Sequence, residues 1–178
     1  MRETENAFRW YAYKVFFNKV FEVDRAMREE GVETYFPTVQ EDKLVGDKVR
    51  KVIRPAISSL LFVHGAESMV LDWQKRLSGK VMLYSHVAGG VRVPSAIDEE
   101  EMRVFILVSS SADERLQYLD VGTVNYREGQ KVKVLDGPYK GCSGYIKRIK
   151  GNRRLLVAVE GLALVATSYI PSAFLEKL

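Results

Sequence analysis

A polar stretch near residue 110 divides the chain into two unlike halves. Residues 109–123 are mostly small or charged, although Leu116, Tyr118 and Leu119 interrupt them. This composition is typical of a linker. The 178 residues are therefore predicted to form two small domains, 1–110 and 125–178, joined by a linker at 111–124.

The charges are distributed unevenly between the two halves. Residues 1–110 hold 16 basic and 16 acidic residues, whereas residues 124–178 hold 10 basic and 4 acidic ones, a net charge of +6. The chain therefore has two electrostatically different halves.

Composition excludes several classes of protein. With 47% hydrophobic and 11% aromatic residues, the chain has the profile of a folded globular protein. Its longest apolar runs are about a quarter of the roughly 20 residues that a transmembrane helix needs, so no membrane span is expected. The first nine residues carry Arg2, Glu3 and Glu5 and lack the apolar segment of a secretory signal, which predicts a cytoplasmic location.

No group of residues predicts catalysis or metal binding. Cys142 is the single cysteine, and only His64 and His86 accompany it as possible zinc ligands. The acidic run Glu99–Glu101 is expected at the start of a helix, where negative charge is favoured, instead of in an acid–base pair. We therefore expect no enzymatic activity, no cofactor and no metal.

The first half alternates strands and helices. Strands are expected at residues 8–16, 34–39, 60–63, 81–84 and 90–93, and helices at 19–30, 68–77 and 97–108. Asn18 is predicted as the N-cap of the first helix and Gly31 as its C-terminal glycine. Gly46-Asp47 marks a hairpin tip, and Ser95 to Asp98 has the spacing of a capping box. This order predicts an α+β fold with helices on a mainly antiparallel sheet.

The second half consists of short runs separated by turn residues. Strands are expected at 131–135, 144–149, 155–160, 162–169 and 174–178, which predicts a small five-stranded β-barrel. The Leu and Ala content of 155–166 would also suit a helix.

Several segments resemble the NusG family of transcription elongation factors. In chain order they are Trp10-Tyr11, Tyr35-Phe36-Pro37-Thr38, Arg54-Pro55, Leu61-Phe62-Val63, Val91-Arg92-Val93-Pro94 and Glu128–Gly144. The last resembles a KOW motif, in which Gly137 and Gly144 frame a hairpin. The resemblance covers nearly the whole chain. It implies an N-terminal α/β sandwich of the NGN type followed by an SH3-like KOW barrel.

Two segments are more specific. Pro55–Val63 and Arg148–Arg154 resemble the specialised UpxY-type paralogues, which are similar to antiterminators of capsular-polysaccharide operons. The resemblance implies a factor that binds the RNA polymerase clamp and suppresses pausing and termination. The implied contact residues are Ile57, Ser58, Ser59, Leu60 and Phe62. Further implied partners are nascent RNA or non-template DNA and, through the KOW domain, a ribosomal protein or a termination factor.

The implied contact strand has two possible interpretations. Leu60 and Phe62 share one face of the strand, and Leu61 and Val63 share the other. Either the first face meets the polymerase, or both faces are internal, as in a buried central strand. Residues Ile57 to Leu60, which lead into this strand, stand where family members commonly have Phe-Pro-Gly-Tyr. Because aliphatic residues replace the two aromatic ones, the implied contact surface stays apolar but loses ring stacking.

Five basic residues surround a turn in the second half, with no acid among them. They are Lys147, Arg148, Lys150, Arg153 and Arg154. Such a tip can bind phosphates, but a solvated hairpin tip is the common alternative. No aromatic residue interleaves the cluster, so base stacking is not expected. A ribosome-associated RNA-binding KOW protein would carry a similar tail and is the alternative function.

Overall fold

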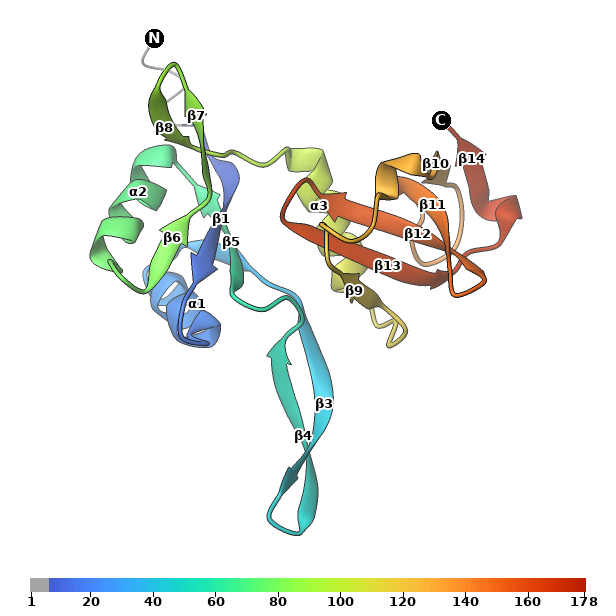
Figure 1. The fold of residues 1–178 in the computed structure, drawn as a ribbon, viewed down its shortest axis with the longest axis horizontal. Coiled ribbons are helices and arrows are strands. Elements are labelled where there is room, and N and C mark those ends of the chain that lie inside the picture. Colours follow the sequence, from blue (N-terminus) through green and yellow to red (C-terminus); the bar gives the residue numbers. More distant parts are fainter. Residues whose placement is uncertain (1–6) are drawn as a thin grey trace. The chain divides into compact units, whose positions relative to one another are not determined.

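The computed structural model describes residues 7–178; the segment around Arg2, Glu3 and Glu5 lies outside this range. Contacts divide the chain into two compact units between Asp98 and Glu99 (Figure 1). The units together hold three α-helices and mainly antiparallel sheets within the described part of the chain. The expected division into 1–110, 111–124 and 125–178 stays a prediction about which pieces fold independently.

The first unit is built on a four-stranded antiparallel sheet in the order β2-β5-β1-β6. These strands are β1 (Arg9–Val15), β2 (Glu33–Tyr35), β5 (Leu60–Gly65) and β6 (Val81–Leu83). The central strand β5 pairs with both β1 and β2, and Leu60 to Val63 are all buried. The short apolar run therefore forms the centre of the sheet, as predicted.

Two helices cover one face of this sheet, α1 (Val20–Glu29) and α2 (Glu67–Arg76). Residues of both helices form one core cluster with inward-facing residues of the strands. The cluster comprises Tyr11, Tyr13, Val15, Val20, Val23, Met27, Leu61, Val63, Val70, Trp73, Val81 and Leu83. The Tyr13 hydroxyl donates to the Val70 carbonyl, which satisfies the buried polar group that this residue brings into the core.

The ends of the helices confirm one prediction and correct two. Gly31 follows α1 with φ 80°, and its amide donates to the Arg28 carbonyl, as expected of a C-terminal glycine. Asn18 is not the N-cap, because Lys19 occupies that position and Asn18 adopts a left-handed conformation with φ 55°. The third helix begins at Glu99 and not at Ile97, because Ile97 forms a β-bridge with Trp10. The predicted capping box at Ser95 to Asp98 therefore does not start this helix.

Two separate hairpins extend the first unit. The longer one joins β3 (Thr38–Val45) to β4 (Lys48–Pro55) through the predicted tip Gly46-Asp47, where Gly46 has φ 62°. The expected strand at 34–39 is divided between β2 and β3 at Phe36-Pro37, because proline cannot donate to a ladder. The shorter hairpin joins β7 (Ser85–Ala88), which was not predicted, to β8 (Val91–Pro94).

The second unit contains a six-stranded antiparallel sheet in the order β14-β10-β11-β12-β13-β9. Its strands are β9 (Gln117–Leu119), β10 (Gln130–Val134), β11 (Ser143–Ile149), β12 (Asn152–Val159), β13 (Ala163–Tyr169) and β14 (Leu175–Lys177). Short 3-10 helices span Tyr126–Glu128 and Ser172–Phe174. All five expected strands are present. Residues 155–166 form two strands around Gly161 instead of the alternative helix.

The helix expected at 97–108 is α3 (Glu99–Ser109), and it packs against β12 and β13 of the second unit. Its buried residues are Met102, Val104, Phe105, Val108 and Ser109. Part of the expected linker is also structured, because β9 pairs with β13 through Leu119 opposite Leu164. The second unit therefore includes a helix and a strand that precede the five predicted strands.

Candidate functional site

The face of the first sheet opposite the helices carries the predicted polymerase contact residues. Leu60 lies opposite Lys14, and Phe62 lies opposite Ala12. Leu60 is 3% exposed and Phe62 is 0% exposed, yet neither belongs to the core cluster under the helices. Both side chains are therefore buried on the face of the sheet away from the helices, which agrees with the interpretation that both faces of this strand are internal. A partner can bind this face only when it is uncovered.

The preceding turn holds the other three predicted contact residues. Ile57 and Ser59 are partly buried, and Ser58 is exposed. Ser59 has φ 62°, a left-handed conformation that is uncommon for a residue other than glycine. Its carbonyl accepts a 2.8 Å hydrogen bond from the Val15 amide. The turn is therefore held against the end of β1, with Ser58 exposed to solvent.

Two aromatic residues at the other end of these strands are buried. Trp10 is 7% exposed and Tyr11 is 2% exposed. The Trp10 ring lies 5.0 Å from the His64 ring, and Nδ1 of His64 lies 2.9 Å from Oε2 of Glu33. His64 is thus part of a stacked and hydrogen-bonded cluster.

The basic turn in the second unit divides into two groups. It is the tip of the β11–β12 hairpin, where Arg148 lies opposite Arg153 and Lys147 lies opposite Arg154. Arg148, Lys150 and Arg153 are exposed. Lys150 has φ 49° and the following Gly151 has φ 83°, the pattern of a two-residue type I′ turn. These three residues form the exposed tip cluster.

The other two basic residues of this turn have structural partners. The Lys147 ammonium donates to the Asn125 carbonyl at 2.8 Å and lies 3.6 Å from Glu128. The Arg154 guanidinium lies 3.4 Å from the Thr167 carbonyl oxygen and 3.5 Å from that of Arg115. The sequence count of five cations therefore overestimates the charge available to a ligand.

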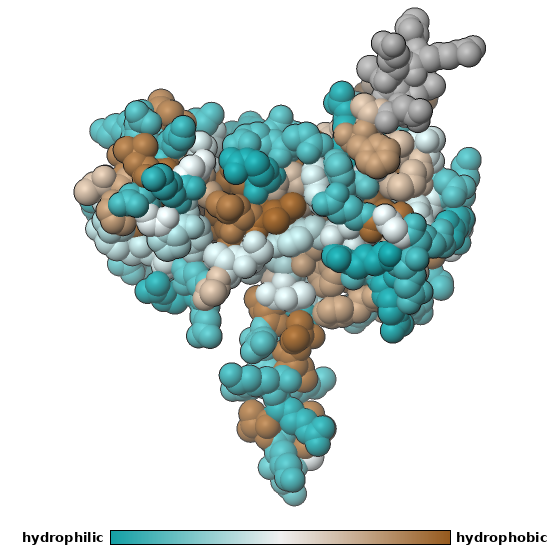
Figure 2. Space-filling model, turned by 180° about the vertical axis from the view of Figure 1, so that it is seen from behind, coloured by the Kyte–Doolittle hydropathy of each residue, from teal (hydrophilic) through white to brown (hydrophobic). Residues whose placement is uncertain are grey.

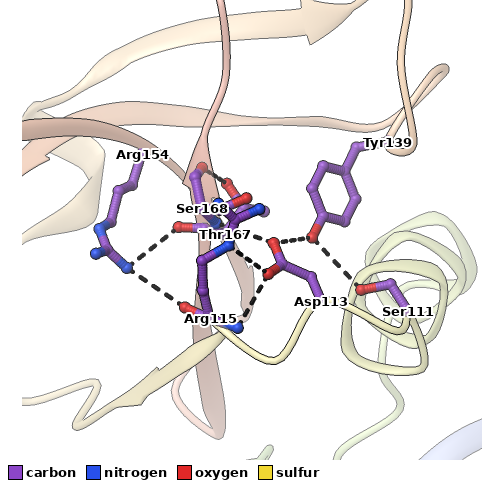
Figure 3. Close-up of polar contacts among 7 residues, drawn as sticks. All are labelled: Ser111, Asp113, Arg115, Tyr139, Arg154, Thr167 and Ser168. Atoms are coloured by element: carbon purple, nitrogen blue, oxygen red, sulfur yellow. Dashed lines mark hydrogen bonds and ion pairs between the residues drawn. The ribbon is translucent and has the colours of Figure 1, made fainter.

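Asp113 joins the start of the expected linker to the sheet of the second unit (Figure 3). Its carboxylate accepts hydrogen bonds from the Tyr139 hydroxyl at 2.8 Å, the Arg115 amide at 2.9 Å and the Ser168 amide at 3.4 Å. Burial acts to raise the Asp113 pKa, but hydrogen bonds from Ser168, Arg115 and Tyr139 outweigh it and hold the pKa well below its ordinary value. Burial raises the pKa of Tyr139 to about 12. We call Asp113 with these three partners the Asp113 cluster.

The β3–β4 hairpin carries charged residues that the sequence interpretation did not single out. Lys43, Lys48 and Arg50 are exposed and project from the same face of this hairpin. The pairing register could have revealed them, because the predicted tip at Gly46-Asp47 already places Lys43 opposite Arg50.

Two observations on the described residues concern metal binding and the reactivity of the single cysteine. Across residues 7–178, no group of three or more His, Cys, Asp or Glu side chains could hold a metal ion. Cys142 is fully buried, and burial raises the pKa of its thiol to about 11. In the same range no helix is long and apolar enough to cross a membrane.

Comparison with known proteins identifies the class. The family model described as "Transcription termination factor nusG" matches residues 8–106. Because this match covers more than half of the chain, the protein belongs to the NusG family. Members of this family are transcription factors that bind RNA polymerase, and they are not known as enzymes.

Among the solved structures that match this chain is one that is aligned over nearly its whole length. It is the NusG of Thermotoga maritima, described as "Domain interaction in Thermotoga maritima NusG". The two chains share 18% identity with a TM-score of 0.49, and the match covers 97% of this chain and 98% of that one. None of the curated protein sequences matches the chain.

Proposed function

We propose that this protein is an operon-specific transcription elongation factor that binds the RNA polymerase clamp and suppresses pausing and termination. The family match over residues 8–106 carries this proposal. Leu60 and Phe62 are buried in the structure, so the proposed contact through them requires that their face of the sheet be uncovered. The segments that resemble UpxY-type paralogues support an antiterminator of a capsular-polysaccharide operon. Such a factor would act in the cytoplasm.

The proposed mechanism is bridging without covalent chemistry. Ile57 to Ser59 would contact the clamp next to Leu60 and Phe62, and the bound factor would hold the clamp closed on nucleic acid. A binder of this kind shifts an equilibrium only by its difference in affinity for the two states. The factor must therefore bind the elongating polymerase more tightly than the paused one.

We propose that residues 125–178 form a KOW domain of the SH3-like barrel type, behind a linker at 111–124. The five strands β10 to β14 and the glycines of the Gly137–Gly144 segment support this assignment. This domain would bind a ribosomal protein or a termination factor. Its exposed tip cluster would contact nascent RNA or non-template DNA.

The same tip cluster favours a second candidate function, a ribosome-associated RNA-binding KOW protein. Arg148 and Arg153 are directly opposite each other, and like charges in that arrangement destabilise a hairpin unless a polyanion compensates them. The two candidates differ in where the main affinity lies. The elongation factor binds polymerase through the first unit, whereas the ribosomal protein binds RNA through the second.

Affinity capture of polymerase from a native lysate tests the proposal. The decisive variants are Leu60→Asp with Phe62→Asp, and Leu61→Asp on the opposite face is the control expected to unfold the first unit. If the double variant stays folded and loses polymerase, the assigned face is supported, because interface anchors typically contribute about 2 kcal/mol or more. A folded double variant that still captures polymerase would contradict the assignment of Leu60 and Phe62 to the polymerase contact.

A milder variant covers the case in which two carboxylates unfold the buried strand. Ser58→Glu changes an exposed residue in the turn before β5 and should leave the melting temperature unchanged. Loss of polymerase capture by this variant supports the contact through 57–62. Full capture by it contradicts the proposed role of the turn.

A further inference from the structure

None of the residues in the two strands of the β3–β4 hairpin is buried. Each arm has eight residues and at about 3.3 Å per residue extends about 26 Å. Both arms are exposed along nearly their whole length, and brown and teal side chains alternate along the projecting segment in Figure 2. An isolated two-stranded hairpin is only marginally stable in water. Its surface residues therefore need an explanation other than packing.

The pairing register sorts these residues onto two different faces. On one face Lys43 lies opposite Arg50, and Val45 lies opposite Lys48. On the other face Leu44 lies opposite Val49, and Asp42 lies opposite Lys51. We call the face with Lys43, Lys48 and Arg50 the basic face.

The basic face carries an excess of positive charge, whereas on the other face the charges of Asp42 and Lys51 balance each other. Lys43 and Arg50 are like charges directly opposite each other, which destabilises a hairpin. No residue in the described range 7–178 forms an ion pair with Lys43, Lys48 or Arg50. Glu41, the acid on this face, pairs with Arg54 nearer the base of the hairpin. Asp47 in the turn is an acid close to these three cations, but the tip keeps a net positive charge, which is complementary to a polyanion.

We propose that the basic face of the β3–β4 hairpin binds the phosphate backbone of duplex DNA. Residues 38–55 include no aromatic side chain, and single-stranded nucleic acids are bound largely by stacking on aromatic rings. Duplex DNA instead offers one negative charge per about 1.7 Å of helix axis. Contacts to phosphates carry no sequence information, so this surface positions the protein on DNA without selecting a site.

DNA binding by the basic face does not depend on the polymerase contact through Leu60 and Phe62. The two surfaces consist of different residues on different strands, and DNA binding is measured without polymerase. Duplex DNA is the proposed ligand in part because the chain belongs to a family of transcription factors, which act where duplex DNA is present. A failure of either proposal is therefore distinguishable from a failure of the other.

The test is fluorescence anisotropy with the full chain and a labelled duplex of arbitrary sequence, across a salt series. Neutralising three phosphate contacts removes about 0.9 each from the slope of log affinity against log salt, about 2.7 in all. The variant Lys43→Gln with Lys48→Gln and Arg50→Gln should therefore lose this slope and bind at least tenfold more weakly at low salt. Every variant is also made with Arg148→Gln and Arg153→Gln, so that the tip cluster of the second unit does not mask the effect.

Arg50 and Lys51 provide a matched pair of single substitutions. They are adjacent on β4, both exposed, and project from opposite faces. Arg50→Gln should weaken DNA binding several-fold, and Lys51→Gln should weaken it less. Arg50→Lys, which keeps the positive charge, should leave DNA binding close to that of the protein with Arg50. Removing a cation from the Lys43–Arg50 pair relieves repulsion, so the melting temperature should stay constant or rise.

Three outcomes would overturn the proposal. Equal losses from Arg50→Gln and Lys51→Gln would show that only net charge matters. Tighter binding to single-stranded RNA or DNA of the same length would contradict the duplex. Loss of binding in Leu44→Ser with Val49→Ser, combined with full binding in the triple variant, would assign the contact to the opposite face.

Discussion

Replacing Asp113 with Asn tests how firmly residues 111–115 are attached to the second unit. One carboxylate oxygen accepts from the Tyr139 hydroxyl and the Ser168 amide, and the other accepts from Arg115. In either orientation, the amide NH₂ of Asn would face donors. A hydrogen bond to a charged group contributes about 1.5–3 kcal/mol. Because the Asp113 side chain is only 12% exposed, water replaces these bonds poorly, and we expect a loss of about 2–3 kcal/mol.

The two tryptophans allow this loss to be assigned to one unit. Trp10 and Trp73 both lie in the first unit, so tryptophan fluorescence follows its unfolding, whereas far-UV circular dichroism follows both units. Asp113→Asn should shift only the transition that tryptophan does not report. For a unit of this size, each 1 kcal/mol corresponds to roughly 4–8 °C, so the shift should be about 10–20 °C. Tyr139→Phe removes one donor and should cost about 1 kcal/mol.

The same variant predicts a pH dependence with a definite sign. The folded pKa of Asp113 lies below its unfolded value, so its stabilisation is fully present above the unfolded pKa of about 3.9 and is lost as pH falls toward the folded value. The stability difference between wild type and Asp113→Asn should be constant above about pH 5 and shrink in more acidic solution. An unshifted second transition, or a difference that persists unchanged into strong acid, would refute the role assigned to the Asp113 cluster.

The second unit allows three further predictions. Arg148→Gln with Arg153→Gln should lower the slope of log affinity for nucleic acid against log salt by about 1.4–1.8. Lys147→Gln should lower this slope less, because Lys147 is hydrogen-bonded to Asn125. If Lys147→Gln lowered the slope as much as the double variant does, the division of the five basic residues into two groups would be wrong. Gly144→Ala should destabilise the unit by about 1–3 kcal/mol in denaturant titration, because its Cβ would lie 2.5 Å from the Leu156 carbonyl oxygen; unchanged stability would exclude that clash. The Cys142 thiol should resist alkylation near neutral pH until the unit unfolds, since burial raises its pKa to about 11; rapid labelling of the native protein would show that it is accessible.

Local patterns predicted the elements whose signal is carried by neighbouring residues. The aromatic and β-branched run of β1, the helical spacing of α1 and the five strands after residue 130 were all found from the sequence. The tip Gly46-Asp47 was found because a two-residue turn has its own residue preferences. β7 was missed, because its residues are mostly exposed and give no apolar alternation.

Long-range pairing explains the remaining differences. β9 has only three residues, and its partner β13 lies far along the chain, so nothing near residues 117–119 predicts a strand. The apolar positions of α3 predict a buried helix but do not specify which sheet it packs against. For the candidate sites, the sequence found the exposed Arg148 and Arg153 but had no means to show that Lys147 and Arg154 bond within the unit. Those partners, Asn125 and Thr167, become neighbours only on folding.

The two basic surfaces share one structural device. Each is a hairpin tip with like charges directly opposite each other, Lys43 with Arg50 in the first unit and Arg148 with Arg153 in the second. Each pair destabilises its own hairpin, and a polyanionic ligand would relieve the repulsion in either one. If one nucleic acid engages both surfaces, the second contact becomes intramolecular and gains from a high effective concentration.

Binding of one nucleic acid by both surfaces sets a quantitative expectation for the whole chain. Three contacts on the β3–β4 hairpin and two at Arg148 and Arg153 of the tip cluster predict a log–log salt slope of about 4.5, compared with about 2.7 and 1.8 for chains that retain only one of these sets. Shared binding also predicts that neutralising both surfaces of the full chain costs less affinity than the product of the two separate losses, because either loss alone already removes the linkage. Slopes that stay unchanged when one surface is neutralised would show that the two hairpins do not act on one ligand.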